Sequence, residues 1–443
     1  MITALSITVL VLFGENAQDP AFPVRLAGDW RVEVAAGTWG AVTLAQAAAF
    51  DIAPPQRVAV RNERQASLPV YNPSAGGWTR GAKPRGIQTE ECTTPGKLYP
   101  ETLRVKAGQE DNTITFTEGK DYLLEPSWGT FGRIEGGAIG ENQEVYIDYD
   151  YEPDRLDTLA INAAGEAHLF EGTPALGVVL PAKEKEGFTP VARVYVPGRI
   201  TKLTEDNLYP LYFDTPDEAR QMPCTAEQLL PITMAKLRSG EPLTLVTFGD
   251  SVTCGGGVGS DQTQWWQGQF TARLKERYPA SQVTWKNAGW GGASSKSYMA
   301  SPRGSEHDYI RDVLEPEPDL VIIEFVNDAG LDEQAVADHY GKILADLRGV
   351  GAEVILMTPH LIRPDWMGLD TAKVKEDPRA YVRGLKAFGK SNQVAVADAS
   401  ALYCDLWRRG LPYMTLMANS INHPDVRGHA LFADALMALF PRQ

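Results

Sequence analysis

A short apolar run that breaks into a serine-containing turn constrains the second half of the chain most. Residues 245–248 read Leu-Val-Thr-Phe, and they are followed by Gly-Asp-Ser at 249–251 and by three glycines at 255–257. Apolar and β-branched residues in such a run predict a buried strand. The turn at its carboxyl end is a position where a nucleophilic serine can be presented. The sequence therefore predicts Ser251 at the rim of a sheet.

The region around this motif alternates between predicted strands and predicted helices. A helix is expected at 226–239, ending at Gly240, and Trp266, Phe270 and Leu274 are spaced by four, as the buried face of a helix requires. Strands are expected at 243–248, 282–286, 320–326, 353–358 and 393–397, with helices at about 261–278, 331–349, 378–390 and 426–440. This alternation predicts a parallel sheet with helices on both faces and active groups beyond the carboxyl ends of its strands.

The first half of the chain has a different pattern. From about residue 28 to 212, apolar and polar residues alternate in short runs separated by glycine-containing turns, which predicts an antiparallel sandwich or barrel. The runs are Trp30–Val34, Thr113–Phe116, Val145–Tyr151, Leu159–Ile161, Ala167–Phe170 and Ala192–Val196. We expect a β-rich accessory domain of one or two modules at 22–215, followed by an α/β domain at 225–443.

The N-terminus begins with an apolar run from Ile2 to Phe13, which is too short to cross a bilayer. It predicts a signal peptide at 1–17 and a secreted or periplasmic protein. No Lys or Arg precedes the run and Glu15 stands where a small residue is usual, so the alternative is a first strand of the N-terminal domain in a cytoplasmic protein. No other window predicts a membrane segment.

Charge and cysteine spacing exclude several classes of function. The formal net charge is −15 and no run is rich in Lys or Arg, which disfavours nucleic-acid binding. A neutral polymer or a small ester is a better partner. The four cysteines, at positions 92, 224, 254 and 404, show no Cys-x-x-Cys spacing. No His-x-His or His-Glu-x-x-His pattern is present either, so neither a metal nor another cofactor is expected.

Four short blocks occur in a specific order along the second half. They are Gly-Asp-Ser at 249–251, Asn-Ala-Gly-Trp-Gly-Gly at 287–292, Val-Asn-Asp at 326–328 and Ile-Asn-His-Pro at 421–424. Together they resemble the four blocks of the SGNH hydrolases, the GDSL-type esterases, over roughly residues 231–440. The resemblance implies a flavodoxin-like three-layer α/β/α domain and a serine esterase that works through an acyl-enzyme intermediate.

The resemblance also assigns roles to individual residues. Ser251 would be the nucleophile and His423 its base, because a serine hydroxyl must lose its proton as it attacks. The oxyanion hole would consist of the backbone N–H groups of Ser251 and Gly292 and the side chain of Asn327. Among the six histidines, His360, which follows a predicted strand, is the one serious rival as base.

Two positions depart from the family pattern. Phe325 replaces the glycine of the third block and is expected to reshape the pocket wall. In the last block Ser420 stands where an aspartate would orient the histidine. A Ser-His dyad could suffice, with a backbone carbonyl, Asn419 or Ser420 holding the ring. Alternatively, Asp365 or Asp398 from another loop could supply the carboxylate, or the protein could be a non-catalytic relative.

We expect the substrate to be an O-acetyl or other short acyl ester, foremost on a polysaccharide. The alternatives are a lipid or thioester acylhydrolase with the same catalytic groups, and a non-catalytic carbohydrate-binding or surface protein. Four aromatic residues of the β-rich half are candidates for sugar stacking, although core or hairpin packing is the favoured explanation for them: Tyr71, Trp78, Tyr122 and Trp128.

Overall fold

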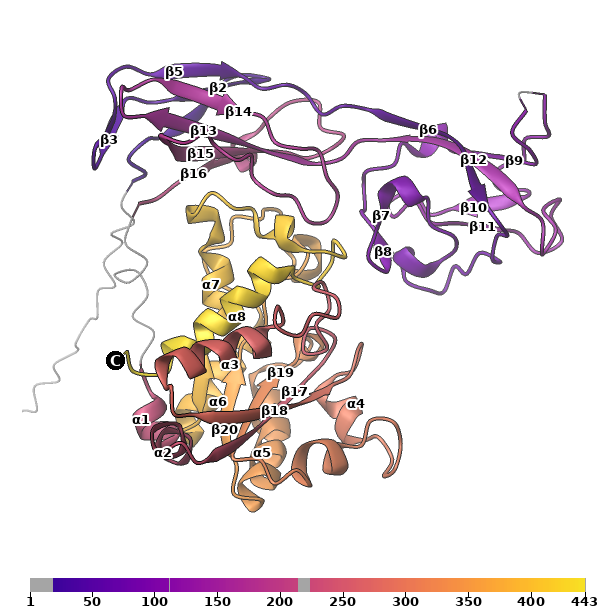
Figure 1. Ribbon diagram of the computed structural model, residues 1–443. Coiled ribbons are helices and arrows are strands. Elements are labelled where there is room, and N and C mark those ends of the chain that lie inside the picture. The colour runs from indigo at the N-terminus through magenta and orange to yellow at the C-terminus, as the bar shows by residue number, and fades with distance from the viewer. Residues whose placement is uncertain (1–18, 111, 214–223, 443) are drawn as a thin grey trace, which may run out of the picture.

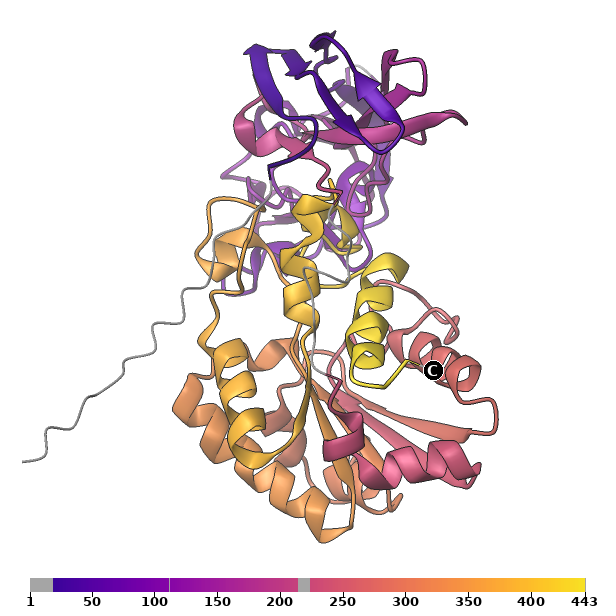
Figure 2. The same ribbon diagram turned by 90° about the vertical axis from the view of Figure 1, so that its left-hand side faces the viewer.

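The computed structural model describes residues 19–110, 112–213 and 224–442, so the predicted signal peptide at 1–17 lies outside the described residues. The strand-rich N-terminal half lies over one end of the C-terminal half (Figures 1 and 2). In the described part of the chain, no helix combines the length and apolar character needed to cross a bilayer.

Two antiparallel sheets form a sandwich at one end of the N-terminal half. Their inner faces share one core, to which Val32 and Val34 contribute from one sheet and Leu159, Ile161 and Val194 from the other. The first sheet is β1 (Val24–Gly28), β2 (Arg31–Val34) and β5 (Ala48–Asp51), and the second runs β14 (Ala167–Phe170), β13 (Arg155–Asn162), β15 (Phe188–Val196) and β16 (Leu208–Pro210). A hairpin of β3 (Gly37–Trp39) and β4 (Val42–Leu44) lies beside them.

A second module, which we call the insert module, comprises residues 58–151 and has its own core. The chain enters it through β6 (Val58–Gln65) and leaves it through β12 (Val145–Tyr151), so it is inserted between strands of the sandwich (Figure 1). β12 pairs with β6 and with β9 (Arg104–Lys106). Two short hairpins complete it: β7 (Gln88–Thr89) with β8 (Cys92–Thr93), and β10 (Tyr122–Leu124) with β11 (Phe131–Arg133).

The predicted strand at Thr113–Phe116 is wrong. This segment makes one isolated bridge, between Thr115 and Lys106, and does not extend into a ladder. Phe116 is buried, but Ile114 is 70% exposed, so the alternating pattern reflects a single edge contact with the three-residue strand β9. Elsewhere the antiparallel character of the N-terminal half is confirmed.

The C-terminal half contains a five-stranded parallel sheet, as predicted, and its strand order is β18-β17-β19-β20-β21. The strands are β17 (Pro242–Gly249), β18 (Gln282–Gly289), β19 (Leu320–Glu324), β20 (Glu353–Met357) and β21 (Ala395–Ala397). In β19, Leu320 and Ile322 point to one core and Val321 and Ile323 to the other. A strand buried on both faces reads as a continuous apolar run, which is why the sequence predicted the central strands well.

Helices cover both faces of this sheet, which confirms the three-layer α/β/α architecture. One layer contains α2 (Pro231–Ser239), α3 (Trp266–Arg277), α7 (Ala399–Cys404) and α8 (Val426–Ala438), and the other contains α4 (Ser295–Met299), α5 (Glu333–Gly349) and α6 (Ala380–Asn392). Trp266, Phe270 and Leu274 of α3 are buried in the first core, as their spacing predicted.

The single helix predicted at 226–239 is broken in two. It forms α1 (Ala226–Leu229) and then α2, which begins at Pro231. Proline has no N–H to donate to the preceding turn and disfavours a helical conformation at the residue before it. Leu230 accordingly leaves the helical region, with φ −132°. The stop at Gly240 is confirmed, since this residue caps α2 at φ +80°.

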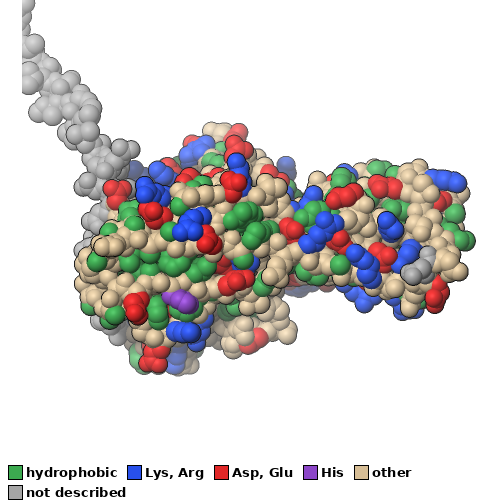
Figure 3. All heavy atoms as spheres, turned by 90° about the horizontal axis from the view of Figure 1, so that it is seen from above, with side chains coloured by type: hydrophobic (Ala, Val, Ile, Leu, Met, Phe, Trp, Pro, Cys, Tyr) green, Lys and Arg blue, Asp and Glu red, His purple; other side chains and the backbone are tan. Residues whose placement is uncertain are grey.

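The outer face of the N-terminal half carries acidic and basic side chains interspersed with apolar ones (Figure 3). The insert module projects to one side in this view, beyond the sandwich. Its β7–β8 hairpin points back toward the loops of the C-terminal half (Figure 1). This hairpin therefore lies at the boundary between the two halves.

Candidate active site

Ser251 lies in the turn that follows β17, at the carboxyl edge of the parallel sheet. The glycines after it allow the chain to pass close to the imidazole of His423. A Cβ atom built on Gly256 would lie 3.1 Å from Cγ of His423, a spacing that leaves little room for any side chain. The glycine run therefore brings the nucleophile loop and the histidine loop into direct contact.

His423 lies in the loop before α8, and its Nε2 atom is 2.9 Å from Oγ of Ser251. The loop is held by Asn419, whose Oδ1 accepts the backbone N–H groups of Ile421, Asn422 and His423 at 2.8 to 2.9 Å. The side chain of His423 is 14% exposed. Ser251 and His423, which lie 172 residues apart in sequence, thus form the hydrogen-bonded pair that a nucleophile and its base require.

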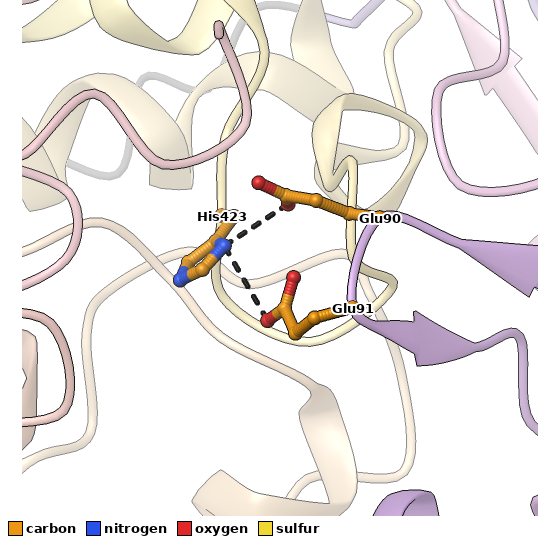
Figure 4. A group of neighbouring side chains, drawn as sticks. All are labelled: Glu90, Glu91 and His423. Carbon is orange, nitrogen blue, oxygen red and sulfur yellow. Dashed lines mark hydrogen bonds and ion pairs between the residues drawn. The ribbon is translucent and has the colours of Figure 1, made fainter.

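The other ring nitrogen of His423 contacts two carboxylates from the insert module (Figure 4). Nδ1 is 3.0 Å from Oε2 of Glu90 and 3.5 Å from Oε1 of Glu91. These glutamates are the two turn residues of the β7–β8 hairpin, in which Thr89 pairs with Cys92. Because an ionised carboxylate only accepts hydrogen bonds, Nδ1 is the donor and Nε2 is free to accept the Ser251 hydroxyl proton.

The charges around this ring shift its proton affinity. Burial alone lowers the pKa of His423, but the hydrogen bond and the negative charge of Glu90, with the charges of Glu91 and Asp250, outweigh it and raise that pKa above its ordinary value. For Glu90, burial raises the pKa, but the hydrogen bond and charge of His423 and the N–H of Gly257 lower it overall. The pair therefore stabilises a protonated imidazole beside an ionised carboxylate.

The predicted oxyanion-hole residues Ser251, Gly292 and Asn327 follow β17, β18 and β19, and β17 lies between the other two strands in the sheet. Gly292 follows β18 in a turn with φ +77°, a conformation that favours glycine. A Cβ atom on its neighbour Gly291 would lie 4.0 Å from Cβ of Ser251. Asn327 follows β19, where its N–H donates to Asp250 at 3.0 Å and its Nδ2 donates to the carbonyl of Ala293 at 3.1 Å. Among the described residues, the side-chain amide of Asn327 donates to Ala293 alone.

This geometry coincides with a match to a known family. Residues 247–431 match the model of the GDSL-like lipase/acylhydrolase family. They form a GDSL-like domain. The match includes the turn at Ser251, the block at 287–292, Asn327 and His423, and it ends within α8. The insert module and the sandwich lie outside it. A comparison with curated proteins gave no match.

Several solved structures are similar to part of this chain. A two-domain esterase (CEX) active on acetylated mannans is 21% identical, with a TM-score of 0.38, over 47% of this chain and 51% of that protein. The match thus spans about half the length of that esterase. Axe2, an acetylxylan esterase from Geobacillus stearothermophilus, is 21% identical over 44% of this chain and 92% of its own, with a TM-score of 0.35. LAE5, an alpha/beta hydrolase from the metagenome of Lake Arreo, Spain, is 20% identical over 44% and 94%, with a TM-score of 0.35.

The structure corrects the two predictions of a carboxylate partner for His423 within the GDSL-like domain. Asp365 instead pairs with Arg363, with Oδ2 2.8 Å from Nη2. Asp398 caps α7 and pairs with Lys386 at 2.6 Å. Each of these two carboxylates is paired within its own domain, and the carboxylates that contact the imidazole are those of Glu90 and Glu91.

Asn419 and Ser420 do not contact the ring in the way predicted. Asn419 holds the backbone of the histidine loop, as described above. Ser420 adopts φ +59°, and its Oγ lies 3.1 Å from Oγ1 of Thr94 and 3.4 Å from Oγ1 of Thr89. Both residues therefore support His423 through the loop and through contacts with the insert module. The acidic turn at Glu90–Glu91 was a signal the sequence offered, but nothing local tied it to His423.

His360, the alternative candidate for the base, is buried in the domain and contacts the histidine loop rather than Ser251. It is fully buried, and its Nε2 lies 2.7 Å from the carbonyl oxygen of Asn422. Burial and the charge of Arg379 hold the pKa of His360 well below its ordinary value. It therefore supports the histidine loop as a neutral ring. Phe325, predicted to reshape the pocket wall, is fully buried against Phe248, with ring centroids 4.8 Å apart, so it belongs to the core.

Two buried acids lie beneath the nucleophile. Asp250 accepts the N–H groups of Val252 and Asn327, and its burial raises its pKa to about 7. Glu324, the last residue of β19, is fully buried and accepts the Thr253 hydroxyl at 3.2 Å. Burial, followed by the charge of Asp250, holds the pKa of Glu324 well above its ordinary value. Asp250 thus fixes the turn of Ser251 to the residue predicted to stabilise the oxyanion.

Among the described residues, one group has ligand atoms close enough to hold a metal ion. It comprises Glu90, Glu91 and His423, whose candidate atoms lie within 4.8 Å of one another. A cation bound there would compete for Nδ1 of His423, the atom that Glu90 engages.

Proposed function

We propose that the protein is a serine esterase that removes acetyl or other short acyl groups from esters of carbohydrates. The observation that carries the proposal is the 2.9 Å contact between Oγ of Ser251 and Nε2 of His423 within a GDSL-like domain. A serine hydroxyl is a weak nucleophile until a base accepts its proton, and this contact supplies the base.

The reaction follows from the positions of these groups. Oγ of Ser251 attacks the ester carbonyl carbon while its proton moves to Nε2 of His423. The N–H groups of Ser251 and Gly292 and the amide of Asn327 stabilise the negative oxygen. The tetrahedral intermediate collapses, the sugar oxygen leaves with the proton from His423, and an acyl-serine remains. Water then gives a proton to His423 and attacks the acyl group, which releases the acid and returns the proton to Ser251.

An aromatic cluster beside the histidine loop supports a carbohydrate as the alcohol part of the ester. Trp128 of the insert module packs with Ile421, two residues before His423. Trp78 lies 5.4 Å from Trp128 and 5.3 Å from Trp366, measured between ring centroids, and Trp366 is 44% exposed. Aromatic rings with open faces provide the flat apolar surface that a sugar ring needs for stacking. Trp128 itself is mostly buried, so stacking is proposed for Trp78 and Trp366.

The proposal is tested by acetate release from p-nitrophenyl acetate and from acetylated xylan, with wild type, Ser251→Ala and Ser260→Ala. Ser260 is an exposed serine of the same loop and serves as the matched control. We expect Ser251→Ala to lower kcat by about 10⁴-fold or more, since its loss removes the nucleophile. Ser260→Ala should keep the wild-type rate.

The substrate class is tested in the same assay. Faster turnover of the polymer than of p-nitrophenyl acetate, and a rise in KM for the polymer alone in Trp366→Ala, would support the carbohydrate ester. Activity that rises with acyl chain length would instead indicate a lipid or thioester substrate. A wild-type protein that is inert on all these esters would contradict the esterase proposal.

A further inference from the structure

Glu90 of the insert module contacts His423, the general base of the proposed esterase site. We propose that Glu90 is the positioning carboxylate of His423, so that the catalytic apparatus is assembled from both halves of the chain. The inference rests on the proposed function. It also explains how the site works although Ser420 stands where the family has its aspartate.

Glu90 contacts both loops that carry the catalytic pair. Its Oε2 atom accepts Nδ1–H of His423 at 3.0 Å, and its Oε1 atom accepts the N–H of Gly257, in the nucleophile loop, at 3.0 Å. One carboxylate therefore fixes the tautomer of the imidazole and also the distance between its loop and that of Ser251. An acid in this place stabilises the imidazolium that forms when Ser251 attacks.

The hairpin that carries Glu90 is fixed to the histidine loop on both sides. Before the turn, Thr89 is within hydrogen-bond distance of the Ser420 hydroxyl, and Thr94, after the turn, reaches the same oxygen. At the turn itself, Nδ2 of Asn419 donates to Oε1 of Glu91 at 2.9 Å. These contacts, made over more than 320 positions in sequence, hold the Glu90 carboxylate at a set distance from the ring.

The backbone at Glu90 is a second sign of function. Glu90 adopts φ +43° at the first position of a two-residue hairpin turn, where glycine, asparagine or aspartate is usual. Ser420, on the facing turn, also has positive φ. Non-glycine residues in this region are strained and gather at sites where a side chain is needed. Glycine would relieve the strain at residue 90 but would remove the carboxylate.

Glu91 is placed less favourably for this role. Its oxygen lies 3.5 Å from Nδ1 of His423, its side chain is 52% exposed, and it already accepts a hydrogen bond from Asn419. Glu90 is 34% exposed and makes the shorter contact. Because Glu90 and Glu91 are neighbours in the same turn, Glu91→Gln tests whether any nearby carboxylate could position the His423 ring.

The experiment compares Glu90→Gln, Glu90→Asp and Glu91→Gln in the full chain, with the exposed Glu135→Gln of the insert module as the control. We expect Glu90→Gln to lower kcat by about 10²- to 10⁴-fold with little change in KM, because the imidazolium loses its counter-charge. Glu91→Gln should lower kcat far less than Glu90→Gln does, and Glu135→Gln should leave kcat unchanged. Glu90→Asp should retain more of the rate than Glu90→Gln, because it keeps a carboxylate.

A pH profile separates this role from a merely structural one. The neutral imidazole is the active base, so kcat/KM rises as His423 loses its proton. Without Glu90 the pKa of His423 should fall and the acid limb of the profile should move to lower pH. The other titratable groups around the ring are Glu91, Asp250, His360 and His429, and the two Glu90 variants retain all four residues.

Titration of the His423 ring by NMR gives a readout independent of turnover. A lower ring pKa in Glu90→Gln than in wild type, with a lower kcat, supports the inference. An unchanged ring pKa, or a wild-type kcat in a folded Glu90→Gln protein, overturns it while leaving the esterase proposal intact. A wild-type protein without esterase activity overturns the esterase proposal and, with it, the catalytic role of Glu90, whereas the NMR titration still decides whether Glu90 sets the ring pKa.

Discussion

His423 uses both of its ring nitrogens, and each has a different task. Nε2 faces the Ser251 hydroxyl, and Nδ1 faces Glu90. The carboxylate fixes which nitrogen carries the proton, so the ring is ready to accept another. The raised pKa of His423 implies an acid limb of the kcat/KM profile above the ordinary imidazole value, with activity increasing as the pH rises through it.

Asn327 is the residue for which the oxyanion assignment makes the clearest prediction. We expect Asn327→Ala to lower kcat by about 10²- to 10³-fold while KM changes little, because the lost donor acts mainly on the charged intermediate. Steady-state kinetics on p-nitrophenyl acetate measures both constants, and the exposed Asn142→Ala is the control. A rise in KM at constant kcat would mean that Asn327 binds the ground state, and the assignment would be wrong.

The sequence predicted the roles of those site residues that lie within the four blocks. Ser251 and His423 were predicted because each occurs in a block of fixed order, and the structure brings them together. Glu90 was missed because it lies 333 positions from His423, in a module outside the family match. The missing aspartate indicated that a partner had to be sought, but local pattern directed the search to Asp365 and Asp398.

The elements predicted best are those whose two faces meet different cores. Side chains of β17, β19 and β20 alternate between the two cores of the GDSL-like domain. Both faces of these strands are therefore apolar, and the resulting apolar runs identified the strands in the sequence. Elements that depend on a single contact were predicted poorly: Thr115 makes one bridge in a segment predicted as a strand. The two-residue strands β7 and β8 carry no periodic signal, although they position Glu90.

Glu324, at the carboxyl end of β19, is expected to make the stability of the protein depend on pH. In the unfolded chain Glu324 ionises at its ordinary pKa, whereas burial and the charge of Asp250 raise that pKa in the folded protein. Between these two values the folded state holds a proton that the unfolded state has released, so this residue lowers stability as the pH rises. Because glutamine does not titrate, Glu324→Gln removes this difference in proton binding between the folded and unfolded states.

We therefore expect the Tm of Glu324→Gln, relative to wild type, to increase between about pH 5 and about pH 8. Differential scanning calorimetry at both pH values measures the difference, and the exposed Glu241→Gln should show no such trend. An equal Tm difference at the two pH values would show that Glu324 is ionised in the folded protein and would contradict the assigned direction of its pKa.

At the scale of the whole molecule, the N-terminal half lies over the carboxyl edge of the C-terminal sheet (Figures 1 and 2). The sequence predicted a β-rich half and an α/β half, because each has its own periodicity. Their relative placement depends on side-chain contacts between distant segments, such as Thr94 with Ser420 and Asn419 with Glu91, and no local pattern encodes these. The accessory half therefore supplies part of the site that the sequence assigned to the second half alone.

The proposed esterase activity requires Ser251 to be a nucleophile that His423 activates. Labelling of the full-length protein with a fluorophosphonate, followed by intact and peptide mass spectrometry, tests it most directly. We predict one adduct per chain, located on Ser251, no adduct in Ser251→Ala and much slower labelling in His423→Ala. An unlabelled wild-type protein, or an adduct on another residue, would contradict the account.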